Sequence, residues 1–159
     1  MDKKRGKRNS RGQSQIPFGM IFSVILIIVF VAFAIYGINK FIEVQRFAQV
    51  GKFKSDFQTD IDKMWKSTQG SQSVTYYLPK SIKQVCFQER ENPRTLKDEN
   101  MYFMPDDESQ FDGALLDNLN IVATTTGLPN GRLCIDVVNG KISMIIKKGY
   151  NENLVTITK

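Results

Sequence analysis

The segment IPFGMIFSVILIIVFVAFAIYGI, residues 16–38, decides the fold class of this chain. It has no charged residue, and the uncharged stretch around it runs from residue 12 to residue 39. As a helix, 23 residues rise about 34 Å, more than the roughly 30 Å thickness of a bilayer's hydrocarbon core. The sequence therefore predicts a transmembrane helix over residues 15–39 and a lipid bilayer as its first partner.

Basic residues are concentrated directly before this segment: Lys3, Lys4, Arg5, Lys7, Arg8 and Arg11. Lysine and arginine beside a membrane span are retained on the cytoplasmic side. This topology signal predicts a cytoplasmic tail over residues 1–14 and, outside the cell membrane, everything after residue 40. A cleaved secretory signal, cut near Ala32 and Ala34, is the alternative. The apolar run is longer than in signal peptides and continues past these alanines, which favours a retained signal-anchor.

The formal charge of +6 belongs to the tail, because six of the 22 basic residues and one of the 16 acidic residues lie in the first 39 positions. The remaining chain is nearly neutral, so it has no basic bias to attract nucleic acid. After the tail and the span are subtracted, enough chain is left for one small domain.

The helix is predicted to continue beyond the membrane as an amphipathic helix over residues 40–66. Its apolar residues recur at helical spacing: Phe41, Val44, Phe47, Ala48, Val50, Phe53, Phe57, Ile61 and Met64, with Trp65 beside them. Polar side chains such as Lys54 fill the other face, which is expected to be solvated. The helix is expected to end at residues 67–71, where the composition is typical of a loop.

Residues 72–159 are predicted to form an antiparallel β domain, and the whole chain an α+β fold in which the helix packs on one sheet, a meander. β-type runs occupy residues 73–78 and 82–88, joined as a hairpin or a corner, and residues 119–126 and 153–158. Residues 89–112 are charged and read as irregular. The apolar helix stripe is expected to cover the apolar face of the sheet.

The sequence LCIDVVNGKISMII, residues 133–146, predicts a β-hairpin, because Asn139 and Gly140 tolerate the positive φ values of a type I′ turn. A two-residue loop would pair Val138 with Lys141. The further pairs would be Val137–Ile142, Ile135–Met144 and Leu133–Ile146, which all lie on one apolar face. The same register would place Cys134 opposite Ile145.

The chain has two cysteines, Cys86 and Cys134, and no histidine. If the domain faces an oxidising exterior, a disulfide between them is the natural interpretation. Two buried free thiols are the alternative. Metal binding is the weakest interpretation, because two isolated cysteines without histidine fall short of a zinc site.

The groups of most enzyme mechanisms are missing, since no histidine general base and no phosphate-binding glycine motif is present. An acidic cluster, Asp106, Asp107, Glu108 and Asp112, invites a calcium site, but its spacing favours a solvated loop. Asp60 and Asp62 are two residues apart on the helix and do not face each other. Aromatic residues are expected in the core rather than in a ligand groove: Trp65, Tyr76, Tyr77, Tyr102 and Phe103. We therefore expect no enzyme, no cofactor and no small-molecule substrate.

The basic leader, the residues Arg11-Gly12-Gln13-Ser14 and the apolar run from Ile16 resemble archaeal type IV pilin-like proteins and small uncharacterised archaeal single-pass membrane proteins. The resemblance covers about 50 N-terminal residues. It implies leader cleavage between Gly12 and Gln13 and packing of like subunits through their N-terminal helices. Pilins usually carry glutamate at the fifth mature position, which here is Pro17.

Two classes of function remain. The first is a pilin-like structural or assembly subunit, whose helices bundle and display the β domain outside. The second is a monomeric membrane-tethered binding module or an accessory subunit of a membrane complex. The loss of about 12 N-terminal residues from the mature chain would favour the first class.

Overall fold

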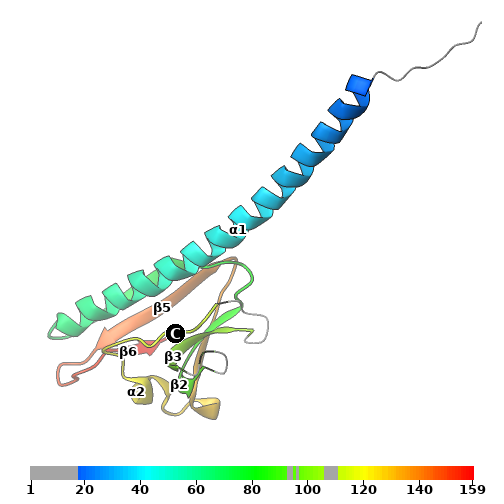
Figure 1. Cartoon of the computed structure of the whole chain (residues 1–159). Helices are drawn as coiled ribbons and strands as arrows, with labels where there is room; N and C mark the ends of the chain where they lie inside the picture. The colour runs from blue at the N-terminus through cyan, green and yellow to red at the C-terminus, as the bar shows by residue number, and fades with distance from the viewer. Residues whose placement is uncertain (1–17, 93–94, 96, 106–110) are drawn as a thin grey trace, which may run out of the picture. The chain divides into compact units, whose positions relative to one another are not determined.

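The computed structural model describes residues 18–92, 95, 97–105 and 111–159. The chain divides into two compact units, Met1–Phe41 and Ile42–Lys159, and the helix α1 (Phe18–Lys66) has residues in both (Figure 1). The predicted α+β class is confirmed, because this helix is followed by two small antiparallel sheets. The six basic residues of the tail and the proposed cleavage position, Gly12–Gln13, lie outside the described residues.

The second part of α1 buries one stripe of side chains: Val50, Phe53, Phe57, Ile61 and Met64. This part of the predicted stripe is confirmed. The residues predicted to pack on the sheet, Phe53, Phe57, Ile61 and Met64, are all buried, whereas Val44, Phe47 and Trp65, which extend the apolar spacing, are exposed. Phe53 is buried against Tyr76 and Phe103, whereas the exposed Phe47 packs edge-on against Phe111, with ring centres 5.1 Å apart. Helical spacing therefore predicts the buried face, whereas the extent of burial depends on where the sheets lie.

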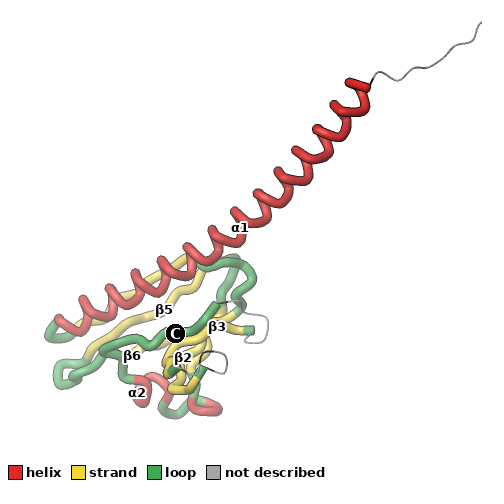
Figure 2. Tube along the Cα trace, viewed as in Figure 1, coloured by secondary structure: helices red, strands yellow, loops and turns green. Residues whose placement is uncertain are grey.

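Six strands form two three-stranded sheets rather than one meander, which corrects the prediction (Figure 2). The first sheet has the order β1-β5-β6, with β1 (Gly70–Tyr77), β5 (Lys141–Lys148) and β6 (Thr156–Thr158). The second has the order β3-β2-β4, with β2 (Gln84–Glu91), β3 (Asp98–Met104) and β4 (Leu133–Asp136). The predicted runs 73–78 and 82–88 thus meet at a corner between the two sheets, not in a hairpin.

The turn at Asn139-Gly140 is confirmed, but the predicted hairpin beyond it is wrong. Both turn residues have positive φ, 54° and 75°, and Val138 and Lys141 exchange two backbone hydrogen bonds of 2.9 and 3.0 Å. After this pair the strands separate, so that Ile135 pairs with Val85 and Met144 pairs with Val74. The predicted face is nevertheless right, because both sheets turn their apolar sides to one core. Period-two alternation specifies a strand's face but not its partner.

Two further predictions are corrected. Part of the run 119–126 is a short helix, α2 (Ile121–Thr125), because the Asn120 side chain caps it by accepting a bond from the amide of Ala123. The hydroxyls of Thr125 and Thr126 also donate hydrogen bonds to carbonyl oxygens one turn back, so both hydroxyls are paired at the end of the helix. The stretch 89–112, read as irregular, contains strand β3. A short 3-10 turn, Pro129–Gly131, precedes β4.

A single hydrophobic core joins the helix to both sheets. The ring of Phe57 is fully buried and lies 5.6 Å from Tyr76 in the first sheet and 5.9 Å from Phe87 in the second. The six residues of the predicted apolar face all belong to this core, with Val137 only partly buried: Leu133, Ile135, Val137, Ile142, Met144 and Ile146. The expected packing of helix stripe on sheet face is confirmed, although two sheets share that face. Figure 1 shows α2 on the side of this unit away from α1.

Candidate functional site

The first part of α1 presents apolar side chains around its whole circumference. Phe18, Phe33 and Phe41 are 84%, 73% and 70% exposed, and the isoleucines and valines between them are exposed as well. The helix is long and apolar enough to cross a membrane, with a mean hydropathy of 3.0 in its most apolar window. In water, so large an apolar surface would be unfavourable by about 25 cal/mol for each Å² left uncovered. The feature that most directly suggests a function is therefore this helix surface.

The two cysteines form a disulfide, as predicted, within the second sheet. Cys86 in β2 lies directly opposite Cys134 in β4, with their Cα atoms 4.1 Å apart. The predicted position of Cys134 opposite Ile145 is wrong, because β4 pairs with β2 and not with β5. Cys86 is fully buried, and it lies on the other face of β2 from Val85 and Phe87, whose side chains are in the core. The bond therefore ties two neighbouring strands whose cysteines are 48 residues apart in sequence.

A row of polar helix side chains holds the segment that follows β3. Lys54 donates hydrogen bonds to the carbonyl oxygens of Asp112 and Gly113, at 2.7 and 2.9 Å. One turn further along the helix, Gln58 accepts a bond of 3.0 Å from the amide of Asp117. Another turn on, Asp62 accepts a bond of 3.0 Å from the side chain of Asn118. The expectation of a wholly solvated polar face is therefore wrong at three positions, Lys54, Gln58 and Asp62.

Lys54 combines this anchoring role with partial burial. Desolvation by burial lowers the pKa of the Lys54 ammonium, while the nearby Asp112 and Glu99 carboxylates act in the opposite direction. Its Nζ atom also lies 5.6 Å from the centre of the Phe103 ring. The side chain thus reaches from the helix across the edge of the core to a backbone that would otherwise present unpaired carbonyls.

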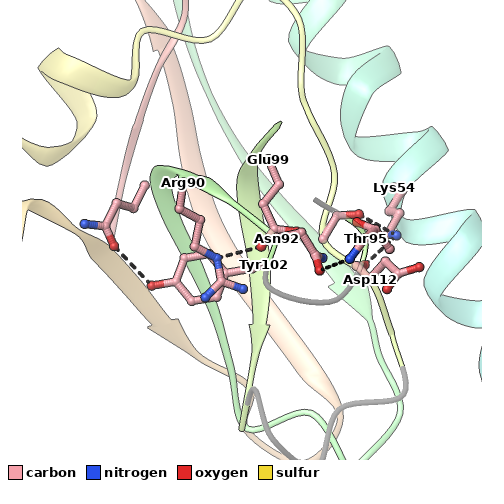
Figure 3. A network of polar contacts seen from close by, with 9 residues as sticks. Lys54, Arg90, Asn92, Thr95, Glu99, Tyr102 and Asp112 are labelled. Carbon is pink, nitrogen blue, oxygen red and sulfur yellow. Dashed lines mark hydrogen bonds and ion pairs between the residues drawn. The ribbon is translucent and has the colours of Figure 1, made fainter. Parts of the chain in front are cut away.

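A second polar network surrounds the buried carboxylate of Glu99 in β3 (Figure 3). Glu99 is only 3% exposed, and its two oxygens accept bonds from Arg90 Nε at 2.6 Å and from Asn92 Nδ2 at 2.9 Å. The Arg90 guanidinium also lies over the ring of Tyr102, 3.5 Å from its centre. Both oxygens of the buried carboxylate are therefore paired, as stability requires. Such a satisfied network is typical of a structural rather than a reactive carboxylate.

The segment around Gly113 fits tightly against this network. A Cβ atom on Gly113 would lie 2.0 Å from a Glu99 oxygen and 2.4 Å from the carbonyl oxygen of Met101, so only glycine is accommodated there. The buried Asn100 side chain binds both the amide and the carbonyl of Leu116, at 2.7 and 2.8 Å. Together with the row on α1, these bonds fasten residues 112–118 along the outer side of β3.

Asp60 and Asp62, which were expected not to act as a pair, have separate partners. Asp60 accepts a bond of 2.7 Å from the Tyr76 hydroxyl and pairs with Lys63 at 3.0 Å. Asp62 accepts from Gln58 and Asn118. Burial and the bond to Asp60 raise the pKa of Tyr76 above its ordinary value. The hydroxyl therefore remains a hydrogen-bond donor at the margin of the core.

The aromatic residues divide between core and surface. Tyr76, Tyr102 and Phe103 are buried, as expected, whereas Tyr77 and Trp65 are exposed, contrary to expectation. Of the acidic cluster, Asp112 belongs to the anchored segment, while Asp106, Asp107 and Glu108 lie outside the described residues. Within the part of the chain that the structure describes, no group of three or more Cys, Asp or Glu is arranged to hold a metal ion.

Several hollows lie on the described part of the second unit, and two of them adjoin the disulfide and the Glu99 network. One, of about 580 Å³, lies beside the disulfide between α2, β4 and β6, with Thr124, Arg132 and Cys134 in its wall. The other, of about 710 Å³, lies over the Glu99 network and includes Lys54, Lys97 and Asp98. Among the described residues, they present no nucleophile beside a general base.

Sequence reasoning missed the residues that organise this surface. Glu99 and Asn100 fell in the stretch read as irregular, and Gly113 directly follows it, although the apolar piece at residues 101–104 marks the strand. Lys54, Gln58 and Asp62 recur every four residues beside the buried stripe, a spacing that aligns them on one side of a helix. Nothing in the sequence indicates which loop they would hold.

No protein-family model, no curated protein and no solved structure matches this chain.

Proposed function

We propose that this chain is a non-enzymatic, single-pass membrane-anchored protein that displays its α+β domain outside the cell membrane as a pilin-like structural or assembly subunit. The observation that carries the proposal is the division of α1. Residues 18–41 are apolar and exposed all round, whereas residues 42–66 are amphipathic and bury one stripe in their own domain. A helix of this kind has one part for lipid or like helices and one part for its own domain.

The outside location is supported by two independent features. The basic residues before Gly12 form a positive-inside signal. The disulfide between Cys86 and Cys134 is a bond that persists in oxidising compartments and is rare in the cytosol. Both features support the same proposed location for the domain.

The second candidate is a monomeric membrane-tethered binding module or accessory subunit. Pro17 favours it, because this residue takes the fifth position after the proposed cleavage point, where pilins usually carry glutamate. The open hollows of the β domain are also compatible with a partner. In that case the anchor serves only to hold the domain at the membrane surface.

Protease treatment of intact spheroplasts tests the shared part of the proposal. The β domain should be digested in intact spheroplasts, and a cytoplasmic marker protein should survive. Alkylation under denaturing, non-reducing conditions should leave Cys86 and Cys134 unmodified. Full protection of the domain together with free thiols would contradict the outside location.

The mature mass then separates the two candidates. A pilin-like subunit is expected to lack residues 1–12 and to migrate with like subunits after crosslinking in native membranes. A tethered module is expected to retain its N-terminal residues. After crosslinking it should migrate as a monomer or together with a different protein. Replacement of Gly12 by a bulky residue should abolish processing only in the first case.

A further inference from the structure

We infer that a small hollow at the start of the second unit binds the phosphate of an anionic phospholipid headgroup. The inference rests on the proposed membrane anchorage for the source of its ligand. The hollow measures about 250 Å³ and is formed by α1 on one side and by the loop between β1 and β2 on the other. The residues that line it are Ile42, Gln45, Arg46, Gln49, Pro79, Lys80 and Ser81.

The helix contributes one face to the hollow, because Ile42, Gln45, Arg46 and Gln49 follow the spacing of neighbours on an α-helix. Arg46 comes eight residues after Ile38, the end of the apolar run. Side chains on a helix lean toward its N-terminus, and an arginine stem can lie along apolar surface while its guanidinium reaches a polar layer. From its place on the helix, the Arg46 side chain is expected to lean toward the end at which the proposed membrane span finishes.

The loop contributes its polar residues from a fixed backbone. Leu78 and Ile82 are buried in the core, which clamps both ends of the loop. The amide of Leu78 donates to the carbonyl of Gly140 at 2.9 Å, and that of Ile82 to the carbonyl of Pro79 at 3.0 Å. Lys80 and Ser81 stand exposed between these anchors. Their positions are thus set before any ligand arrives, which lowers the entropic cost of binding.

The charge of the hollow is positive. Two cations, Arg46 and Lys80, line it, and no carboxylate is among the described residues of its wall. A third cation, Lys83, donates from its ammonium to the carbonyl of Lys80 at 3.0 Å and so lies beside the same loop. Two glutamine amides and a serine hydroxyl add neutral donors. Arginine, lysine and such donors are the groups that bind phosphate oxygens, and each cation near an anionic membrane surface adds to binding.

The phosphate is assigned to a lipid rather than to free phosphate because of Ile42. This residue is 40% exposed and, of the residues that line the hollow, it is the nearest in sequence to the apolar run. A phospholipid bound through its headgroup would place its glycerol and first acyl carbons against such a side chain. Free phosphate would gain nothing from it.

Native mass spectrometry of the full-length protein in detergent tests this inference. One phosphatidylglycerol should bind per chain, at least about tenfold more tightly than phosphatidylcholine, whose headgroup has no net charge. The double variant Arg46→Gln with Lys80→Gln should lose at least about tenfold in affinity for phosphatidylglycerol. Lys66→Gln with Lys147→Gln removes two positive charges at exposed positions outside the hollow and should bind as the unaltered protein does. The exchange Arg46→Lys with Lys80→Arg should retain binding.

Three results would overturn the inference. Equal binding of phosphatidylglycerol by the Arg46 and Lys80 double variant and by the unaltered chain would exclude the hollow. Equal binding of phosphatidylcholine would exclude selection by charge. Displacement of the lipid by inorganic phosphate at matched concentration would assign the hollow to free phosphate. Failure here is distinguishable from failure of the proposed function, because protease access and membrane retention of the full chain do not depend on Arg46 or Lys80.

Discussion

The two parts of α1 share one continuous helix but differ in what surrounds them. In residues 18–38 nearly all side chains are exposed, and the exposed surface is apolar on every side of the helix. In residues 42–66 two faces have partners within the domain, because Phe57 enters the core and Lys54 holds the segment after β3. The apolar residues of the first part therefore determine which solvent the helix prefers, lipid or water. The apolar residues of the second part instead make particular contacts within the domain.

Charges should therefore have the largest effect in the first part. Ile28→Arg together with Val31→Arg places two charges near the middle of the apolar run, at about 2.5–3.5 kcal/mol each in membrane insertion, or about 6 kcal/mol together. We expect the protein to leave the carbonate-resistant membrane fraction. Ser55→Arg with Thr59→Arg, at exposed positions of the second part, should leave retention unchanged. Equal retention of both double variants would mean that residues 18–41 do not cross the membrane.

Truncation of an aromatic ring should instead have its larger effect in the second part of α1. Phe57→Ala removes a fully buried side chain and should lower the free energy of unfolding by about 3–5 kcal/mol. Phe30→Ala, which removes a 65% exposed ring from the first part, should change the unfolding of the β domain little. Urea unfolding of the full chain in detergent, followed by the fluorescence of the single tryptophan, Trp65, measures both. Equal small effects would mean that the helix does not pack on the sheets.

The smallest expected effect on the free energy of unfolding comes from two lysines on the polar side of the second part of α1. Lys54→Met leaves the carbonyl oxygens of Asp112 and Gly113 without their donor and should lower stability by about 1–2 kcal/mol. Lys52→Met breaks only an exposed ion pair with Asp56, 2.9 Å long, and should stay within about 0.5 kcal/mol. The same unfolding measurement applies. A larger effect at Lys52 than at Lys54 would contradict the anchoring role of the row on α1.

Features that depend on the local sequence could be predicted, whereas features that depend on packing between distant segments could not. The buried stripe from Val50 to Met64 could be predicted because helical spacing is a local property of the sequence. The turn at Asn139-Gly140 could be predicted because these residues accept positive φ. The partners of the following strands could not, because Ile135 and Met144 face the same core whether they pair with each other or with Val85 and Val74. Strand β3 was missed because its first residues, Asp98 and Glu99, are charged, and the burial of Glu99 depends on Arg90 and Asn92.

By itself, the sequence determined that the chain has one helix long and apolar enough to cross a membrane, one buried helix stripe and an α+β class. These properties depend on composition and on periodicity within a single element. Only the tertiary structure decided that the strands form two sheets and that Cys134 lies opposite Cys86 in the second of them. It also decided that Lys54 anchors a distant loop and that Arg46 and Lys80 share one hollow. Such contacts join residues far apart in sequence, and several pairings satisfy the same local pattern, so the packing of the whole domain selects among them.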